Sequence, residues 1–348
     1  MANEIEEVVV MVHGVQQRRE PGSNAGNYAD LFNGISDRLP AGSAWKRARM
    51  VEVEWGKDDP DAPDPAANHR KLSAAQRNYA DATLKAAEEE REPTLNPARR
   101  VISGLRPTCV RGFGDMFYYV SADGKASLRR TLVRYLAGRL SGGLAGSDGD
   151  LPTRPLSLTF VGHSAGAVIC ADFLFYLFHE ARSEEDYLGQ ACGPERHLPG
   201  GLPPLDTETR ENLATLKARA EDGTLRVRRL ITLGSPFSMV LARSAAVVER
   251  LAASADARLD PADYGLTGSK ADEPGSAFGG ALDGPRWINV WDKDDLIAYP
   301  VEPVFPGPGA DGGAAVVDVN VNVGSGVTTV HNAYWQDRKV WAALAGRW

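Results

Sequence analysis

Apolar residues gather in six short runs along the chain, separated by polar or glycine-rich segments. Runs of this length, rich in valine, isoleucine and leucine, are typical of strands buried in a sheet. Segments with apolar residues at helical spacing lie between most of the runs, which is the alternation expected of a parallel α/β sheet. The sequence therefore predicts an α/β fold with strands at about residues 7–12, 50–55, 156–161, 226–233, 286–291 and 315–323.

The segments between these runs divide into helical patterns and loops. Apolar positions at helical spacing predict helices at residues 71–91, 124–140, 167–179, 207–221 and 238–253. Polar segments rich in glycine, proline or alanine predict loops at 57–70, 141–149, 255–284 and 302–314. No internal repeat is visible. We expect one domain over residues 1–348, with insertions at about 57–110, 183–225 and 255–284 that form a lid.

The composition is that of a globular protein, with 43% hydrophobic and 24% charged residues among 348. A net charge of -7 and scattered basic residues argue against a nucleic-acid-binding surface. No stretch approaches the ~20 apolar residues of a membrane span, and the acidic N-terminus is unlike a signal peptide. Cys109, Cys170 and Cys192 lack metal-ligand spacing and are expected to be free thiols. We expect a cytoplasmic protein without cofactor or metal, of open oligomeric state.

The strongest chemical signal is a G-x-S-x-G pentapeptide at residues 162–166, placed between a predicted strand and a predicted helix. Gly162 and Gly166 allow a turn that is too tight for side chains at those positions. Ser164 is then held at the tip of the turn, with its hydroxyl exposed at the carboxyl end of the sheet. This setting is typical of a serine nucleophile. His163 is expected to support the turn by packing, not to act on the proton.

Other reactive side chains follow strand-like runs in a definite order. His13 and Gly14 end the first run, the aspartates at 292, 294 and 295 follow the run at 286–291, and His331 follows the last β-rich segment. A serine hydroxyl is a weak nucleophile at neutral pH and needs a neighbouring base. A carboxylate behind an imidazole fixes its tautomer and stabilises the imidazolium. The chain therefore supplies a serine, an acid and a histidine, in that order.

This order resembles that of the α/β-hydrolase superfamily, and within it the cytosolic-type serine esterases and lipases. The resemblance implies an α/β-hydrolase fold, a mostly parallel sheet flanked by helices with loop and helix insertions that form a lid. The matching segments span residues 8 to 335 and are Val10-Met11-Val12-His13-Gly14-Val15, Glu52-Val53-Glu54-Trp55-Gly56, the serine pentapeptide, Leu233-Gly234-Ser235-Pro236, residues 294–300 and His331-Asn332-Ala333-Tyr334-Trp335.

The resemblance also implies a role for each member of a catalytic triad. Ser164 is expected to be the nucleophile and His331 the base. Asp295 is the preferred acid, because it begins a segment similar to the family's Asp-Pro-Val-Ala, although Leu296 replaces the proline. The other two aspartates of the loop remain open as the acid. Together the three lack the Asp-x-Asp-x-Asp-Gly framework of a calcium loop.

An oxyanion that forms during acyl transfer needs preorganised hydrogen-bond donors. The amide of Ala165, directly after the nucleophile, is expected to supply one at the start of a helix. By resemblance, the second donor is the amide of Val15, which follows His13 and Gly14. His13 is expected to support this loop through hydrogen bonds.

The motifs point to a serine hydrolase that cleaves carboxylic esters through an acyl-enzyme, with a small-molecule ester or a lipid as substrate. Small-ester esterase, lipase, phospholipase and thioesterase share the same triad and stay open. A hydrolase-fold interaction or regulatory protein with an occluded site is an alternative of another class, because fold alone does not certify activity. Aromatic residues at 113–119 could line an acyl site, although such runs more often belong to a core.

Overall fold

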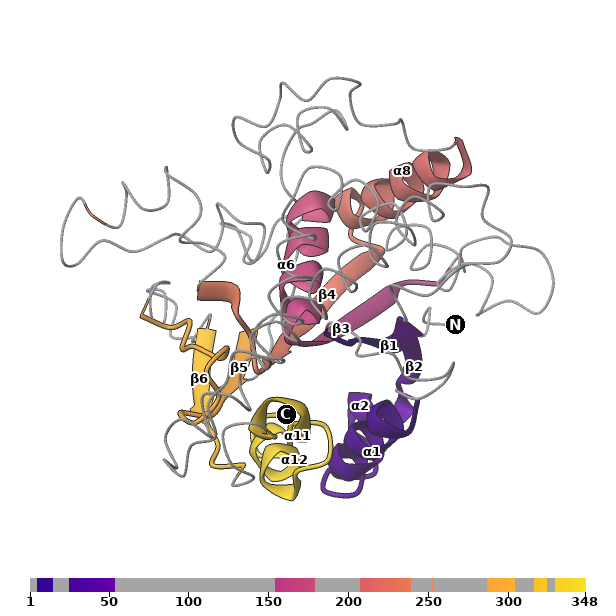
Figure 1. Cartoon of the computed structure of the whole chain (residues 1–348). Coiled ribbons are helices and arrows are strands. Elements are labelled where there is room, and N and C mark those ends of the chain that lie inside the picture. The colour runs from indigo at the N-terminus through magenta and orange to yellow at the C-terminus, as the bar shows by residue number, and fades with distance from the viewer. Residues whose placement is uncertain are drawn as a thin grey trace, which may run out of the picture.

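A sheet of six parallel strands organises the part of the chain that the structure describes (Figure 1). The structure is a computed structural model, and it describes residues 5–14, 25–53, 154–178, 207–238, 252, 287–303, 316–323 and 329–348. The strand order is β2-β1-β3-β4-β5-β6. The strands are β1 (Glu6–Val12), β2 (Arg49–Val53), β3 (Leu156–His163), β4 (Leu225–Leu233), β5 (Trp287–Trp291) and β6 (Val316–Asn320).

Helices cover both faces of the sheet (Figure 1). On one face lie α6 (Ala165–Phe178) and α8 (Thr207–Glu221). On the other face lie α1 (Ala25–Ser36), α2 (Ala44–Arg47), α11 (Val330–Ala333) and α12 (Arg338–Ala345). A strand covered from both sides needs apolar side chains at successive positions. The burial of every residue from Val8 to Val12 in β1 satisfies this requirement.

The core between the sheet and α1 is formed by residues at helical spacing. Tyr28, Leu31 and Ile35 lie on one side of α1 and are almost completely buried. They join Val340 and Leu344 of α12 in one apolar cluster with alternate residues of the strands. α1 and α12 also pack against each other. The C-terminal helix therefore closes this face of the sheet together with the first helix of the chain.

The opposite core lies between the sheet and α6. The rings of Phe160 on β3 and Phe173 on α6 lie 6.0 Å apart between their centroids. α8 packs on both α6 and β4, and it buries Leu216 and Ala220. Although the sequence analysis assigns residues 207–221 to an insertion, this helix thus contributes to the core beside α6.

The predicted α/β class and all six predicted strands are confirmed, with ends that differ by a few residues. The helix predicted at 207–221 is confirmed, and the helix predicted at 167–179 is α6. α1 and α12 were not predicted. α1 contains two glycines and two asparagines, which lower helix propensity, and α12 has only eight residues. Both helices owe their stability to tertiary packing, which the local sequence does not reveal.

Several predictions fall on other parts of the chain. The helices expected at 71–91 and 124–140 lie outside the described residues, as do almost all of the helix expected at 238–253, the aromatic residues 113–119 and most of the three expected insertions. The single-domain division and the lid therefore stay predictions. Among the described helices, none is long and apolar enough to cross a membrane.

The contact between α1 and α12 can be tested at Gly34. A Cβ added there would fall on the indole ring of Trp341. Gly34→Ala should therefore lower the free energy of unfolding by about 1–3 kcal/mol, the usual cost of overpacking, despite alanine's better helix propensity. Gly42→Ala is the matched control, because a Cβ at Gly42 meets nothing within 4 Å. Urea unfolding measures both, and equal stability of the two variants would refute the packing described here.

Candidate active site

The strand registers bring the carboxyl ends of four strands to one edge of the sheet. Val12 of β1 pairs with Gly162 of β3, and His163 pairs with Leu233 of β4, which in turn pairs with Val290 of β5. The segments that follow these strands therefore meet at one place. β1 lies between β2 and β3, so the strand order reverses at this point. In open α/β sheets, ligands bind in the crevice outside such a reversal.

Ser164 occupies the turn between β3 and α6 in a strained conformation. Its φ angle is 54°, in the left-handed region that side chains rarely adopt. Its amide donates to the Leu233 carbonyl at 2.9 Å, which ties the turn to the neighbouring strand. A Cβ at Gly162 would lie 2.6 Å from the Ala167 backbone, and one at Gly166 would lie within contact of the Val12 carbonyl. Only glycine fits at both places, as the pentapeptide predicts.

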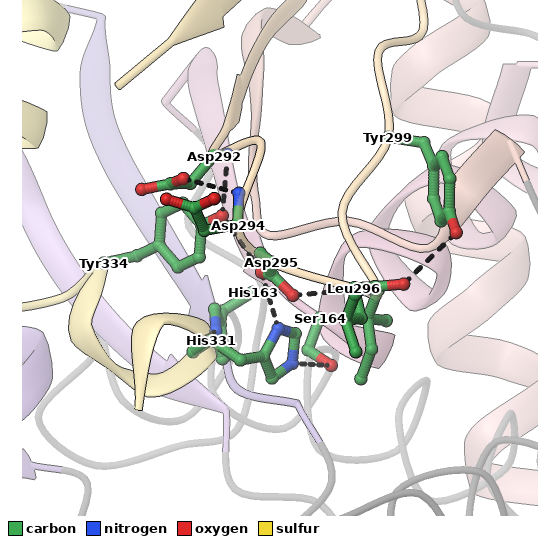
Figure 2. Close-up of polar contacts among 10 residues, drawn as sticks. His163, Ser164, Asp292, Asp294, Asp295, Leu296, Tyr299, His331 and Tyr334 are labelled. Carbon is green, nitrogen blue, oxygen red and sulfur yellow. Dashed lines mark hydrogen bonds and ion pairs between the residues drawn. The ribbon is translucent and has the colours of Figure 1, made fainter. Parts of the chain in front are cut away.

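Three predicted residues form a continuous chain of hydrogen bonds (Figure 2). His331 Nε2 lies 2.8 Å from Ser164 Oγ, and His331 Nδ1 lies 2.8 Å from Asp295 Oδ2. A carboxylate accepts, so Nδ1 carries the proton and donates to Asp295. Nε2 of the neutral ring is then the acceptor for the serine hydroxyl. The imidazole is therefore oriented to take a proton from Ser164.

The Asp295 carboxylate is almost completely buried, at 4% exposure. Burial raises the pKa of this carboxyl, but the hydrogen bond and charge of His331 outweigh it, together with hydrogen bonds from the Ile297 amide and the Tyr334 hydroxyl. The net effect lowers the pKa of Asp295 below its usual value. The Ile297 amide donates to Oδ1 at 3.0 Å, and Tyr334 donates to Oδ2 at 3.0 Å. The side chain is therefore a carboxylate at neutral pH.

The other two aspartates of the loop have different surroundings. Asp292 is buried, and its carboxylate accepts from the amides of Asp294 at 2.8 Å and Val323 at 2.6 Å. These bonds fix the start of the loop against the segment that follows β6. Asp294 is exposed to solvent. Of the three aspartates, the structure brings Asp295 to His331.

His163 and His13 are buried beside this chain of hydrogen bonds. The rings of His163 and His331 lie 4.9 Å apart between centroids, and His163 Nε2 donates to the His331 carbonyl at 2.6 Å. Burial, followed by the charge of His331, lowers the pKa of His163 to about 3, so this ring is neutral. His13 Nδ1 donates to the Gly14 carbonyl at 2.5 Å. Both side chains therefore hold backbone groups around the serine.

Gly14, which follows β1, lies directly against Ser164. A Cβ at Gly14 would lie 2.5 Å from Ser164 Cβ and 3.1 Å from its Oγ, so only glycine fits here. Ala165 is the first residue of α6. Amides in the first turn of a helix have no acceptor within the helix and attract negative charge. Val15, the other expected donor, lies outside the described residues.

Other reactive groups in the described part of the chain do not form a second site of this kind. No group of three or more His, Cys, Asp or Glu side chains there could hold a metal ion. Cys170 on α6 is a buried free cysteine, and burial raises the pKa of its thiol. A thiol in that state is a poor nucleophile. Cys109 and Cys192 lie outside the described residues.

Tyr334 is the site residue that the sequence analysis did not single out. It lies three residues after His331, one turn along the same segment, and its hydroxyl contacts the carboxylate that holds the histidine. The i, i+3 spacing on a helix would have been the available signal. The sequence analysis assigns no helix to residues 330–335, so it does not use this spacing.

Comparison of the chain with protein-family models, with curated proteins and with solved structures gives no match.

The neutral state of His163 predicts a specific pH dependence of stability. The unfolded chain takes up this proton near pH 6.5, whereas the folded chain does so only near pH 3. Between these values the unfolded state binds more protons, so the free energy of unfolding should rise with pH by about 1.4 kcal/mol per unit. His163→Gln keeps an amide donor for the His331 carbonyl but does not titrate.

Urea unfolding at several pH values between about 3.5 and 7 measures this difference. The stability of the wild type relative to His163→Gln should increase across that window and level off above it. Parallel curves for the two proteins would mean that His163 is not held neutral by the fold.

Proposed function

We propose that the protein is a serine hydrolase of the α/β-hydrolase type that cleaves carboxylic esters through an acyl-enzyme. One observation carries the proposal: Ser164, His331 and Asp295 lie in a hydrogen-bonded row with two distances of 2.8 Å. The strained strand-turn-helix setting of the serine and the chain order of serine, acid and histidine support it. The location at the reversal of strand order supports it as well.

The first half of the reaction acylates the enzyme. Ser164 Oγ attacks the ester carbonyl carbon, while His331 Nε2 takes the hydroxyl proton. Asp295 stabilises the resulting imidazolium through Nδ1. The carbonyl oxygen becomes an oxyanion, which the Ala165 amide at the start of α6 can stabilise. The bond to the leaving alkoxide then breaks, and the alkoxide takes the proton from His331 and departs as an alcohol.

The second half regenerates the serine. Water attacks the acyl carbon as His331 Nε2 takes one of its protons, and a second oxyanion forms at the same place. The bond between the acyl carbon and Ser164 Oγ breaks, and His331 returns the proton to Oγ. A carboxylic acid is released. The same residues serve both halves because the histidine alternates between base and acid.

The proposal is tested at the nucleophile. Ser164→Ala should abolish hydrolysis of p-nitrophenyl esters and labelling by a fluorophosphonate probe, because no other group occupies the position of its Oγ. Ser235→Ala is the matched control: this buried serine also follows a strand, but its Oγ accepts from the Phe237 amide. The control should keep both activities.

A wild-type protein that neither reacts with the probe nor hydrolyses any ester of a graded acyl-length series would refute the proposal. It would favour an interaction protein with an occluded serine instead. Labelling that persists in folded Ser164→Ala would place the nucleophile elsewhere.

The acid can be identified by comparing the three aspartates of the loop. Asp295→Asn keeps the shape of the side chain but favours the wrong tautomer of His331, so kcat should fall by as much as ~10⁴-fold. Asp294→Asn should change kcat little, because this side chain is exposed. Asp292→Asn removes an acceptor of two backbone amides and should act mainly on stability. A larger loss of kcat in Asp294→Asn than in Asp295→Asn would contradict the assignment.

A further inference from the structure

The hydroxyl of Tyr334 bridges two points of the loop that carries the acid (Figure 2). It accepts from the Asp292 amide at 3.0 Å and donates to Asp295 Oδ2 at 3.0 Å. A phenol has a single proton to donate. Because the partner at Asp292 is itself a donor, that proton must point to Asp295. Tyr334 is fully buried, so no water competes for it.

The oxygen that accepts from Tyr334 is the one that accepts from His331. Asp295 Oδ2 lies 3.0 Å from the Tyr334 hydroxyl and 2.8 Å from His331 Nδ1. Two donors on one oxygen divide its negative charge between them. Burial, followed by the nearby Asp295, raises the pKa of Tyr334, so the phenol stays protonated as a donor. The hydrogen bond from Tyr334 therefore reduces the negative charge that Asp295 Oδ2 presents to an imidazolium at His331.

The position of the tyrosine ring is fixed from several sides. Its centroid lies 5.9 Å from that of His163, at the end of β3. At the end of β4, a Cβ on Gly234 would lie 2.8 Å from the ring, so the ring fills the space beside this glycine. One side chain thus contacts the ends of two strands and the acid loop after β5. Since His331 precedes Tyr334 by one turn, acid and base are positioned by the same short segment.

We propose that Tyr334 is a positioning residue of the proposed triad: it orients Asp295 and limits the charge that this carboxylate presents to His331. The inference rests on the proposed function for its catalytic meaning, but the contact itself is independent of the reaction. In the described part of the chain, the other titratable groups near this contact are Asp292, bound to backbone amides, and the neutral His163 with His13 beyond it. Lys293 and Asp294 of the same loop are exposed.

Removal of the Tyr334 hydroxyl should raise the pH at which His331 is half protonated. In Tyr334→Phe the ring remains but the donor is lost, so the full charge of Oδ2 acts on His331. Its imidazolium form gains stability, and the pH at which the His331 ring is half protonated should rise by about 0.5–1 unit. The midpoint on the acidic side of the pH profile of kcat/KM should shift to higher pH by the same amount. We expect kcat at its optimum to fall roughly tenfold with little change in KM, because the lost orientation of Asp295 outweighs the gain in charge on Oδ2.

Tyr299→Phe is the matched control. It removes a tyrosine hydroxyl from the same loop, but that hydroxyl is exposed and donates to the Leu296 carbonyl at 3.2 Å. The half-protonation pH of His331 should be unchanged in this variant. If the loop were merely loosened, the half-protonation pH of His331 would shift by a similar amount in both variants.

The experiment is an NMR titration of the full-length protein with histidine labelled at ring Cε1. The chain has six histidines, and the His331 signal is assigned by its loss in His331→Gln. The readout does not require turnover, so it tests the inference even if the wild type hydrolyses no ester, the result that would sink the proposed function alone. Hydrolysis of p-nitrophenyl acetate across the same pH range gives the pH profile of kcat/KM.

A second variant keeps the test decisive if Tyr334→Phe does not fold. Site-specific 3-fluorotyrosine at position 334 is a stronger donor of nearly the same shape, so it should lower the half-protonation pH of His331. If both variants fold, shifts of the half-protonation pH in opposite directions would support the proposal; if Tyr334→Phe does not fold, a downward shift with fluorotyrosine would support it. An unchanged midpoint, or a shift of the opposite sign in either variant, would overturn it.

Discussion

The parallel register of the central strands is the constraint on which the site depends. Because Val12, Gly162, Leu233 and Val290 lie near one edge of the sheet, the segments that follow them must converge. Parallel pairing also forces each connection across a face of the sheet. Two of these connections begin at His13 and at Ser164, and they contain α1 and α6, which bury the strands. The strained turn at Ser164 is affordable only in such a rigid frame.

A buried carboxylate sets the second constraint, since a charge removed from water is costly unless donors replace the lost hydration. Within the described residues, three groups donate to Asp295: the Ile297 amide, the Tyr334 hydroxyl and the His331 ring. Only the first is local. The other two come from a segment more than thirty residues away, so the charged state of the acid depends on the correct docking of the last helices. Electrostatics and packing are therefore coupled at this loop.

The sequence allowed the strands, and the residues that follow them at one edge of the sheet, to be predicted. It did not allow the contacts that hold those residues in place to be predicted. Strands buried on both faces leave an unbroken apolar run, and a serine between two glycines marks a tight turn. The sequence favours Asp295 over Asp294 because Asp295 begins the segment that is similar to Asp-Pro-Val-Ala. The structure buries Asp295 and exposes Asp294. The spacing of His331 and Tyr334 can place both side chains on one side of a helical turn, but the contact of Tyr334 with Asp295 depends on how that turn docks, which the sequence does not show. The amide of Val15 and most of the expected insertions lie outside the described residues, so for them the sequence remains the basis.

The far end of the loop after β5 is held by a row of polar contacts between β5 and β6. Asn289 on β5 donates to Asp318 on β6 at 2.7 Å and to the Tyr299 carbonyl at 3.0 Å. Asp318 in turn accepts from the amides of Val301 and Glu302. Burial raises the pKa of Asp318 even though these donors oppose it, so its ionised form is held at a cost in stability. Such a cost is tolerable where it fixes geometry. With Tyr334 at one end of the loop and this row at the other, Asp295 is held in one position beside His331.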